Sequence, residues 1–349
     1  MKPDYSKLYN IGMDLHAGLP YCCFGGKALP PLRASLMLTY KCNLSCKMCF
    51  QKEIRNNNFS VSELSYEEIV NIIDQMQPYT LITLTGGEPF IRPDISEIIK
   101  YACKKNFCNI LTNATLIDED DIFLLIESKV RLLGISIDGM DKRHEEIRGV
   151  KGCFEKTIST IRLLQNMKQK YGKKYPLIDI KTMILGENIN EIYEIAKLAV
   201  ELNADFLTVS FPFGKYPFSP KSVVDINQLK KTNEWEKINK FTDYSLQMLN
   251  KLKEINKIKI RFYPEINTLQ KDDLFALSSF KPCKMPWSHL WISPYGEVFP
   301  CLPYAIGNVR QKSINELWNC DRFKNFRNTV KSNCIIEGCY GCCYLKSKR

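Results

Sequence analysis

Three cysteines, Cys42, Cys46 and Cys49, stand in the segment TYKCNLSCKMCF, directly after an apolar run that is typical of a strand. Thiolates are the usual ligands of iron–sulfur clusters, and a cluster of four irons is normally held by four of them. Three thiolates leave one metal position without a protein ligand. By the logic that separates open catalytic zinc sites from closed structural ones, such a position is reserved for a ligand. The triplet therefore predicts a cluster that binds a further molecule.

A second motif follows the next apolar run, LITLTG, which continues into Gly86, Gly87, Glu88 and Pro89. Glycines at the end of a strand let the backbone approach a bound molecule closely, and Glu88 offers a carboxylate. Alone, this motif is typical of a turn. Because it follows the cysteine triplet on a successive strand, the two motifs together indicate one site.

These motifs need a scaffold, and the alternation of strand-like and helix-like patterns from Ala34 to about Phe211 supplies one. The apolar runs are ASLMLTY, LITLTG, CNILTN, LLGISIDG, IDIKTMI and FLTVSFPF. Six βα units are too few for a closed eight-stranded barrel. The pattern predicts an α/β fold, a partial (β/α)6 TIM-like barrel, whose working face lies at the carboxyl ends of the strands.

Helix starts and composition divide the chain further. Ser65 with Glu68 forms a capping box before one amphipathic pattern, and Asp94 with Glu97 precedes another. A long charged helical stretch follows the barrel, and the composition then changes to Cys, Pro, Gly and aromatic residues. The predicted parts are an N-terminal extension (1–33), the barrel (34–225), a helical connection (226–280) and a small Cys-rich C-terminal domain (281–349).

Composition restricts the class of protein. With 349 residues and 45% hydrophobic content, the chain can bury a sizeable core, and it contains neither a signal peptide nor a membrane-spanning segment. Fifteen cysteines without an export signal predict metal sites in a reducing compartment, so we expect a cytoplasmic protein. The net charge of +11 would suit a nucleic-acid binder, but the lysines are spread along the chain. A solvated basic surface is the preferred interpretation, with no nucleic-acid partner.

From Ser35 to Phe211 the sequence resembles the radical S-adenosylmethionine (SAM) enzymes, on the strength of the cysteine triplet and the Gly-Gly-Glu motif. The resemblance implies the partial (β/α)6 barrel, a [4Fe–4S] cluster on Cys42, Cys46 and Cys49, and SAM bound at the open iron. It implies SAM contacts from Gly86, Gly87, Glu88, Ser136, Asp138, Asn113 and Arg148. The competing interpretations are a capped strand end for Ser136 and Asp138, and a surface salt bridge for Arg148.

The C-terminal segment resembles the SPASM extension of such enzymes, because Gly296 is followed by four residues and Cys301. The resemblance implies one auxiliary [4Fe–4S] cluster, on Cys283, Cys301, Cys339 and Cys342. Cys334 or Cys343 could replace a ligand or join Cys320 in a second cluster, and a structural zinc site is the alternative. The remaining cysteines are expected to be small buried hydrophobes: Cys22, Cys23, Cys103, Cys108 and Cys153. No role is assigned to His16, His144 or His289.

The resemblance implies an oxidoreductase-type enzyme that cleaves SAM reductively to a 5′-deoxyadenosyl radical and abstracts hydrogen from a substrate carbon. The leading substrate is a peptide or protein that is oxidised, cross-linked or epimerised. The alternatives are a small metabolite, such as a sugar, tetrapyrrole or lipid intermediate, and a non-catalytic iron–sulfur or zinc module. An electron donor such as flavodoxin or ferredoxin is expected. Only 41 residues precede Cys42, so a separate leader-peptide recognition protein is expected as well.

Overall fold

The computed structural model describes most of the chain, namely residues 5–49, 51–55, 61–210, 247, 250–252, 255–263, 281–302, 304–333 and 336. Four cysteines named above, Cys334, Cys339, Cys342 and Cys343, lie outside the described residues. The predictions for their roles therefore lie outside them as well.

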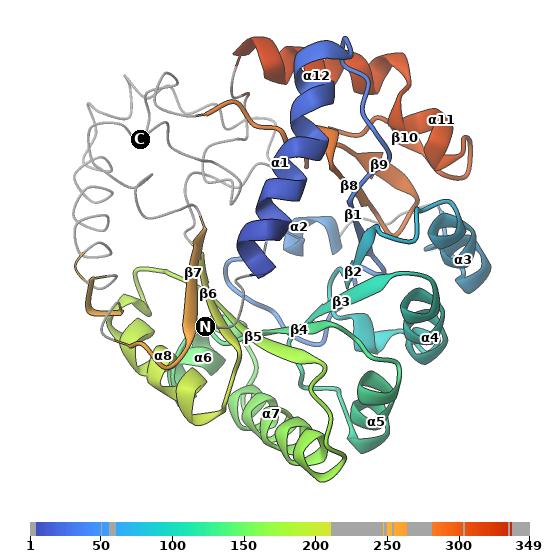
Figure 1. The fold of residues 1–349 in the computed structure, drawn as a ribbon. Helices are drawn as coiled ribbons and strands as arrows, with labels where there is room; N and C mark the ends of the chain where they lie inside the picture. Colours follow the sequence, from blue (N-terminus) through green and yellow to red (C-terminus); the bar gives the residue numbers. More distant parts are fainter. Residues whose placement is uncertain are drawn as a thin grey trace.

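A single curved sheet organises the described residues (Figure 1). Its strands are β1 (Arg33–Met37), β2 (Leu81–Thr85), β3 (Phe107–Thr112), β4 (Leu132–Ser136), β5 (Leu177–Met183), β6 (Phe206–Ser210), β7 (Lys259–Tyr263), β8 (His289–Ile292), β9 (Glu297–Phe299) and β10 (Gly307–Asn308). The order is β10-β9-β8-β1-β2-β3-β4-β5-β6-β7. Strands β1 to β7 are parallel to their neighbours, β8 is parallel to β1, and β9 and β10 are antiparallel. Among the described strands β7 and β10 are the two edges, so the sheet is open between them.

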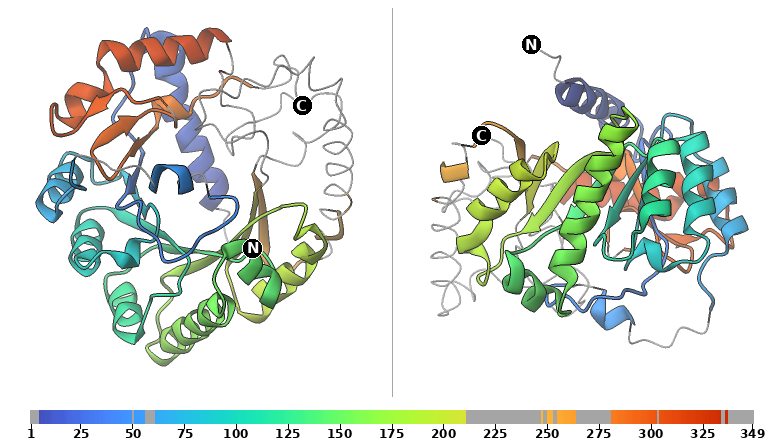
Figure 2. Two further views of the ribbon diagram at one scale, coloured as in Figure 1. Left: turned by 180° about the vertical axis from the view of Figure 1, so that it is seen from behind. Right: turned by 90° about the horizontal axis from the view of Figure 1, so that it is seen from below.

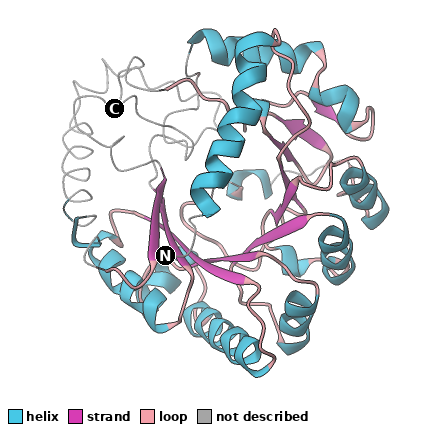
Figure 3. Cartoon of the chain, in the orientation of Figure 1, coloured by secondary structure: helices cyan, strands magenta, loops and turns pink. Residues whose placement is uncertain are grey.

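Helices cover the outer face of the curved sheet, as Figures 2 and 3 show. They are α3 (Tyr66–Asp74), α4 (Ile95–Lys105), α5 (Glu119–Glu127), α7 (Cys153–Lys170) and α8 (Ile192–Glu201). The short helix α6 (Asp141–Arg148) follows β4 and packs against α7. Strand residues that face these helices, such as Ile82, Ile110, Ile180 and Leu207, are completely buried in the main core. Because side chains alternate along a strand, the intervening residues point to the inner face. The predicted α/β partial barrel is confirmed.

The structure extends this barrel beyond the six predicted strands. Strand β7 continues the parallel sheet beside β6, although it lies in the stretch 226–280 that the sequence assigns to a helical connection. Strand β8 belongs to the Cys-rich segment and pairs with β1. The Cys-rich segment therefore shares the sheet of the barrel instead of forming a separate layer. Ser35 of β1 and His289 of β8 are joined by a buried side-chain hydrogen bond of 2.9 Å.

The local helix signals are confirmed in one case and revised in the other. Ser65 and Glu68 form the predicted capping box at the start of α3. Asp94 precedes α4 but makes no side-chain capping hydrogen bond, because its carboxylate is paired with Arg92 through two short contacts of 2.6 and 2.8 Å. Helix α4 begins where the sequence predicts, but Asp94 forms a salt bridge with Arg92 instead of capping the helix.

The described cysteines outside the predicted metal sites differ in burial. Cys108 and Cys153 are buried, as expected for small hydrophobic side chains. Cys103 is only half-buried, with one side packed against the main core. Cys22 and Cys23 are exposed, which corrects the expectation for this pair. They are the last two residues of α1 (Tyr5–Cys23). Among the described residues no helix is long and apolar enough to cross a membrane.

A buried arginine connects the C-terminal helices to the N-terminal part of the chain. Arg327 of α12 (Asp321–Asn333) is fully buried and donates to the carbonyl oxygens of Pro286 at 2.8 Å and Gly26 at 3.1 Å. Its guanidinium lies over the rings of Trp318 and Phe323, 4.3 and 4.1 Å from their centroids. Burial lowers the pKa of Arg327 to about 9, so the group stays charged at neutral pH.

Replacing Arg327 by leucine is therefore expected to lower the free energy of unfolding by about 2–3 kcal/mol, because two buried carbonyls lose a charged donor. Urea unfolding under anaerobic conditions measures this change. Arg322 of the same helix is exposed, and the matched Arg322→Leu variant should stay within about 0.5 kcal/mol of the parent. Equal stability of the two variants would show that the buried contacts of Arg327 contribute nothing.

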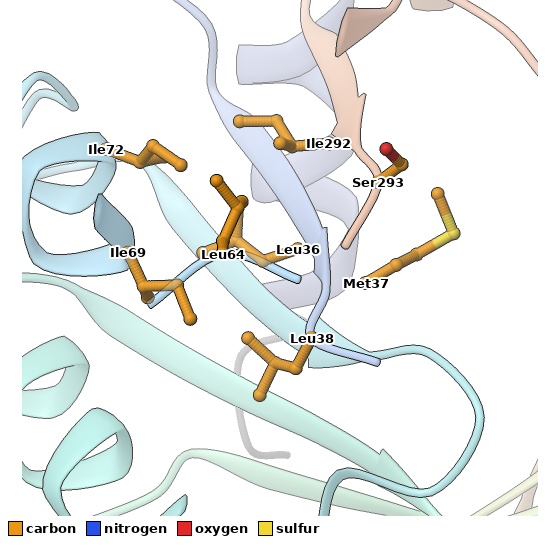
Figure 4. Close-up of a pocket in the computed structure, with 8 residues that line it drawn as sticks. All are labelled: Leu36, Met37, Leu38, Leu64, Ile69, Ile72, Ile292 and Ser293. Carbon is orange, nitrogen blue, oxygen red and sulfur yellow. The ribbon is translucent and has the colours of Figure 1, made fainter. Parts of the chain in front are cut away.

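A small apolar pocket lies where the barrel meets the Cys-rich segment (Figure 4). It is lined by Leu36, Met37, Leu38, Leu64, Ile69, Ile72, Ile292 and Ser293, and its volume is about 10 Å³. A water molecule needs roughly 10–15 Å³ by this kind of measure. The pocket is therefore a packing defect beneath α3 and too small for a substrate.

Candidate active site

The three cysteines of the triplet lie together in the loop that joins β1 to the short helix α2 (Lys52–Arg55). Cys46 is buried, and Cys42 and Cys49 are half-buried. All three pack in one small apolar cluster with Leu44 and Cys153. The structure thus brings the predicted cluster ligands to one place at the carboxyl end of β1.

The cysteine loop is held against the end of α6. The backbone N–H groups of Ser45 and Lys47 donate to the carbonyls of Arg148 and Ile147, at 3.0 and 2.9 Å. Gly149 follows with a φ of +77°, and a Cβ there would meet the carbonyl oxygen of Ser45 at 2.6 Å. Only glycine fits this close approach in a left-handed conformation.

Each sulfur atom of the triplet accepts an N–H group from another residue. The contacts are Leu44 N to Cys42 Sγ at 3.4 Å, Arg55 Nη2 to Cys49 Sγ at 3.2 Å, and Arg148 Nη1 to Cys46 Sγ at 3.5 Å. Two of these donors, from Arg55 and Arg148, are cationic. Burial raises the pKa of Cys42, but a bound metal deprotonates a coordinating thiol outright. The contact of Arg55 with Cys49 was not predicted from the sequence. The signal that could have indicated it is an arginine six residues after the third cysteine.

The Gly-Gly motif is required by close packing of one backbone segment on another. Gly86 has a φ of +135°, and a Cβ on it would meet the carbonyl oxygen of Thr39 at 2.4 Å. A Cβ on Gly87 would meet the carbonyl oxygen of Lys41 at 2.0 Å. The N–H groups of Gly87 and Glu88 donate to the same two carbonyls, at 2.7 and 2.9 Å. The glycines therefore let the end of β2 pack directly on the backbone that leads into Cys42.

Glu88 is buried at the carboxyl ends of β2 and β3. Its carboxylate accepts from Thr112 Oγ1 at 2.7 Å, from Asn113 N at 2.8 Å and from Phe90 N at 3.2 Å. Burial raises the pKa of Glu88 to about 7, and these hydrogen bonds oppose the rise. A buried carboxylate whose pKa lies near neutrality is typical of a functional site.

Asp138 and Arg148 form a buried ion pair just beyond β4. The side chain of Asp138 is 1% exposed and that of Arg148 is 12% exposed. Asp138 also accepts from the backbone N–H of Met183 at 2.7 Å, while its own N–H donates to His144 Nδ1 at 3.2 Å. Arg148 thus forms a salt bridge, but its partner is buried and the pair does not lie at the surface. This pair connects the fourth and fifth strands to the cysteine loop through Cys46.

Asn113 and Ser136, the other predicted contacts, lie at the ends of β3 and β4. The side-chain amide of Asn113 donates to Asn43 Oδ1 at 3.0 Å and points toward Cys42 Sγ at 3.9 Å. Ser136 is half-buried, and its hydroxyl makes no hydrogen bond to another described residue. Cys42, Glu88, Asn113, Ser136 and Asp138 all follow or end one of the first four parallel strands, so they share one edge of the sheet.

A cleft of about 600 Å³ opens beside Cys42. It is lined by Tyr40, Lys41, Cys42, Arg55, Val61, Ser62, Glu63, Ile91 and Tyr295. Tyr295 belongs to the turn between β8 and β9, so the Cys-rich segment supplies part of the wall. Burial and the nearby carboxylate of Glu297 raise the pKa of Tyr40, and its ring lies 5.8 Å from that of Tyr295. The sequence did not predict that these two tyrosines meet. They follow β1 and β8, and the pairing of these two strands arises only in the tertiary structure.

Two predicted ligands of the auxiliary cluster are described. Cys283 precedes the 3₁₀ turn η5 (Met285–Trp287), and Cys301 follows β9, each half-buried. Gly296 forms the turn between β8 and β9 with a φ of +86°. Cys320 lies between α11 (Ile314–Trp318) and α12, packed against the main core.

The donor set of the triplet fits an iron–sulfur cluster. Three thiol groups lie in one apolar, partly covered cluster, and each receives an N–H group, as cluster thiolates do. In the part of the chain that is described, no three His, Cys, Asp or Glu side chains converge on the position of one metal ion. A cluster differs in this respect, because each thiolate binds its own iron.

Comparison with known proteins gives the family. Residues 36–199 match the family model of the radical SAM superfamily, and residues 283–343 match that of an iron–sulfur cluster-binding domain. The chain is 27% identical over 336 residues to the antilisterial bacteriocin subtilosin biosynthesis protein AlbA of Bacillus subtilis, covering 90% of this chain and 68% of that protein. It is 28% identical to an AdoMet-dependent heme synthase of Methanosarcina barkeri, covering 87% of this chain and 89% of that one.

Solved structures show the same fold. The fold is similar to that of Streptococcus suis SuiB bound to SAM, with a TM-score of 0.63 and 18% identity, covering 93% of this chain and 73% of that chain. The matched family models cover more than half of this chain and include both groups of cysteines singled out in the sequence. The chain is thus an enzyme of the radical SAM superfamily, which uses a [4Fe–4S] cluster and SAM, and it carries a C-terminal iron–sulfur cluster-binding domain.

Proposed function

We propose that Cys42, Cys46 and Cys49 hold the [4Fe–4S] cluster and that SAM binds at its open iron. The proposed SAM contacts are Gly86, Gly87, Glu88, Asn113, Ser136, Asp138 and Arg148. The observation that carries this proposal is the common position of the three thiols and the buried Glu88 at one edge of the sheet. When bound, the reduced cluster and SAM would supply the radical that removes a hydrogen atom from a substrate carbon.

Within this site the residues have different tasks. Glu88 is proposed to receive the ammonium group of SAM, and three hydrogen bonds orient its carboxylate. Besides its proposed contact with SAM, Arg148 pairs with Asp138 and donates to Cys46, so it also holds the cysteine loop on the barrel. Leu44, Cys153 and the partly buried Met48 surround the thiols with apolar atoms and restrict the access of water.

The C-terminal domain is proposed to hold one auxiliary [4Fe–4S] cluster on Cys283, Cys301, Cys339 and Cys342. The domain bounds proposed from the sequence, 1–33, 34–225, 226–280 and 281–349, carry over with one change. The third part contributes β7 to the barrel sheet. The half-buried positions of Cys283 and Cys301, on either side of the β8–β9 hairpin, support their assignment.

The proposed substrate is a peptide or protein, which is oxidised, cross-linked or epimerised at carbon. In support, AlbA takes part in bacteriocin biosynthesis, and SuiB has been solved with its precursor peptide SuiA. A tetrapyrrole is the second candidate, because the similarity to the heme synthase extends over nearly the whole of both chains.

Flavodoxin or ferredoxin is the proposed electron donor, and a separate protein is proposed to recognise a leader peptide. A cytoplasmic location belongs to the proposal, because free thiols and reduced clusters need a reducing compartment.

Anaerobic reconstitution tests this function. The reduced protein should bind iron and sulfide, form 5′-deoxyadenosine from SAM, and change the mass of a peptide encoded beside its gene. A loss of two hydrogens indicates oxidation or coupling, and deuterium uptake from solvent indicates epimerisation. Iron and sulfide binding without any 5′-deoxyadenosine would disprove the proposed use of SAM, and turnover of a porphyrin alone would select the second candidate.

Glu88 gives a prediction on pH. In the SAM-free protein its pKa of about 7 means that the carboxyl is half protonated at neutral pH. The ammonium group of SAM prefers the carboxylate, so affinity should fall about tenfold for each pH unit below 7 and level off above it. The Glu88→Gln variant should bind SAM about tenfold more weakly at pH 8, without this pH dependence.

Calorimetric titration of SAM into the anaerobic holoenzyme between pH 6 and pH 8 measures both effects. Glu127 is an exposed carboxylate that pairs only with Lys173 among the described residues, so Glu127→Gln serves as the control. An unchanged pH profile in Glu88→Gln would remove Glu88 from the proposed site.

A further inference from the structure

Four side chains form a row across the inner face of the sheet, from β4 to β7. Ser136 is in register with Lys181, Lys181 with Thr208, and Thr208 with Arg261. Their strand neighbours on the opposite face, such as Ile180, lie in the main core beneath the helices. The row therefore faces the interior of the curved sheet, because side chains alternate between the two faces of a strand. Figure 1 shows the helices on the outer side of this sheet.

The row contains more positive than negative charge. Asp179 lies one step below it on β5 and is 2% exposed. Its Oδ1 accepts from Thr208 Oγ1 at 2.7 Å, and its Oδ2 lies 2.8 Å from Lys181 Nζ and 3.0 Å from Arg261 Nη2. Two cations thus share one carboxylate oxygen, so these three described side chains together carry one net positive charge.

Arg261 has hydrogen-bonding capacity that the described residues do not use. Its Nε and Nη2 atoms are buried and make no hydrogen bond, since the contact with Asp179 has the geometry of an ion pair only. The guanidinium lies flat on the ring of Phe206, 4.0 Å from its centroid. Buried unsatisfied donors are costly, and proteins keep them mainly where a function requires them.

Part of each cationic side chain is exposed, although the Nε and Nη2 atoms of Arg261 are buried. The side chains of Lys181 and Arg261 are 33% and 28% exposed, respectively. Gly134 makes room for the lysine, because a Cβ at this position would meet Lys181 Cε at 2.7 Å. The row also lies next to the proposed SAM site, since Ser136 is one of its members and Met183, two residues after Lys181, donates to Asp138.

From these observations we infer that Lys181 and Arg261 form a subsite for a carboxylate of the substrate, and that this subsite orients the carbon presented to SAM. The inference rests on the proposed function and specifies its substrate class. A carboxylate beside Lys181 and Arg261 would balance the excess positive charge of these two cations. The carboxylate could belong to an acidic side chain of a peptide or to a propionate of a tetrapyrrole.

Binding measurements on the SAM-loaded anaerobic holoenzyme test this subsite. The probes are an oligoglutamate with an oligoglutamine of the same length, and coproporphyrin III with its tetraamide. At fixed ionic strength one carboxylate probe should bind about tenfold or more tightly than its neutral counterpart. The pair that shows this preference identifies the source of the carboxylate.

Variants separate the subsite from general attraction and from misfolding. In Asp179→Asn/Lys181→Gln/Arg261→Gln, which leaves no unpaired buried charge, the preference should fall below about threefold. Asp179→Asn alone frees both cations and should strengthen binding of the carboxylate probe. Lys170→Gln/Lys197→Gln removes two exposed lysines and should keep the preference.

The inference is overturned if the wild-type protein does not discriminate, if the triple variant still does, or if Asp179→Asn binds the carboxylate probe more weakly. Formation of 5′-deoxyadenosine by the wild-type protein without substrate is measured separately. Its absence contradicts the proposed function, whereas the discrimination between probes bears on the subsite alone.

Discussion

Replacing Cys46 by alanine is expected to lower 5′-deoxyadenosine formation by at least about 10³-fold, because the proposed cluster would lose one of its three thiolates. Cys46 is the buried member of the triplet and accepts an N–H group from Arg148. Its loss should also reduce the iron content of the reconstituted protein by as much as about four atoms per chain. Iron analysis and chromatographic measurement of 5′-deoxyadenosine, both under anaerobic conditions, check this result.

The control for this prediction is another buried cysteine. Cys108 lies in β3 and is 1% exposed, but it is not part of the thiol cluster. Cys108→Ala should keep both iron content and SAM cleavage, at a cost of about 1 kcal/mol in stability. Equal losses in the two variants would mean that the iron is lost through general destabilisation, and a fully active Cys46→Ala protein would remove Cys46 from the ligand set.

Replacing Asp138 by alanine lowers the free energy of unfolding by about 3–5 kcal/mol, because it leaves the guanidinium of Arg148 buried without its partner. The variant also loses the acceptor of the Met183 N–H group. Urea unfolding of the anaerobic protein measures the effect. Asp138→Asn/Arg148→Met, which keeps an acceptor for Met183 and removes both charges, should recover most of the stability.

An exposed ion pair provides the comparison. Asp74 and Lys105 lie 2.9 Å apart with 41% and 47% of their side chains exposed, so Asp74→Ala should cost no more than about 1 kcal/mol. If Asp138→Ala is as stable as Asp74→Ala, the buried pair does not hold the cysteine loop. If the double variant is as unstable as Asp138→Ala, the destabilisation does not come from an unpaired charge.

The two buried contacts of Arg148 connect stability with function. Arg148 donates to Cys46 on one side and pairs with Asp138 on the other, and the backbone of α6 anchors Ser45 and Lys47. The loop that presents the thiols is therefore attached to the fourth βα unit. A substitution in the Asp138–Arg148 pair should therefore alter the position of the cysteine loop, even though neither residue is a proposed ligand of iron.

The sequence by itself determined the family and the order of its strands. The six apolar runs all form strands, because each combines high β propensity with flanking turn residues, and the Ser65 capping box starts its helix as predicted. The cysteine triplet and the Gly-Gly-Glu motif were sufficient to indicate a radical SAM enzyme, because their residue types and spacing are local features. The roles of the individual site residues stay predictions.

The contacts between segments far apart in the sequence were decided by the tertiary structure. Strand β7 was missed because KIRFY is short and follows a charged stretch, and it forms where β6 offers an unpaired edge. β8 joins β1 across more than half of the chain, so Tyr295 reaches the cleft beside Cys42. Which charges become buried partners depends on this assembly. Spacing along the chain places a residue on an element, but only the packed sheet determines that Arg148 faces Asp138 and that Lys181 and Arg261 share Asp179.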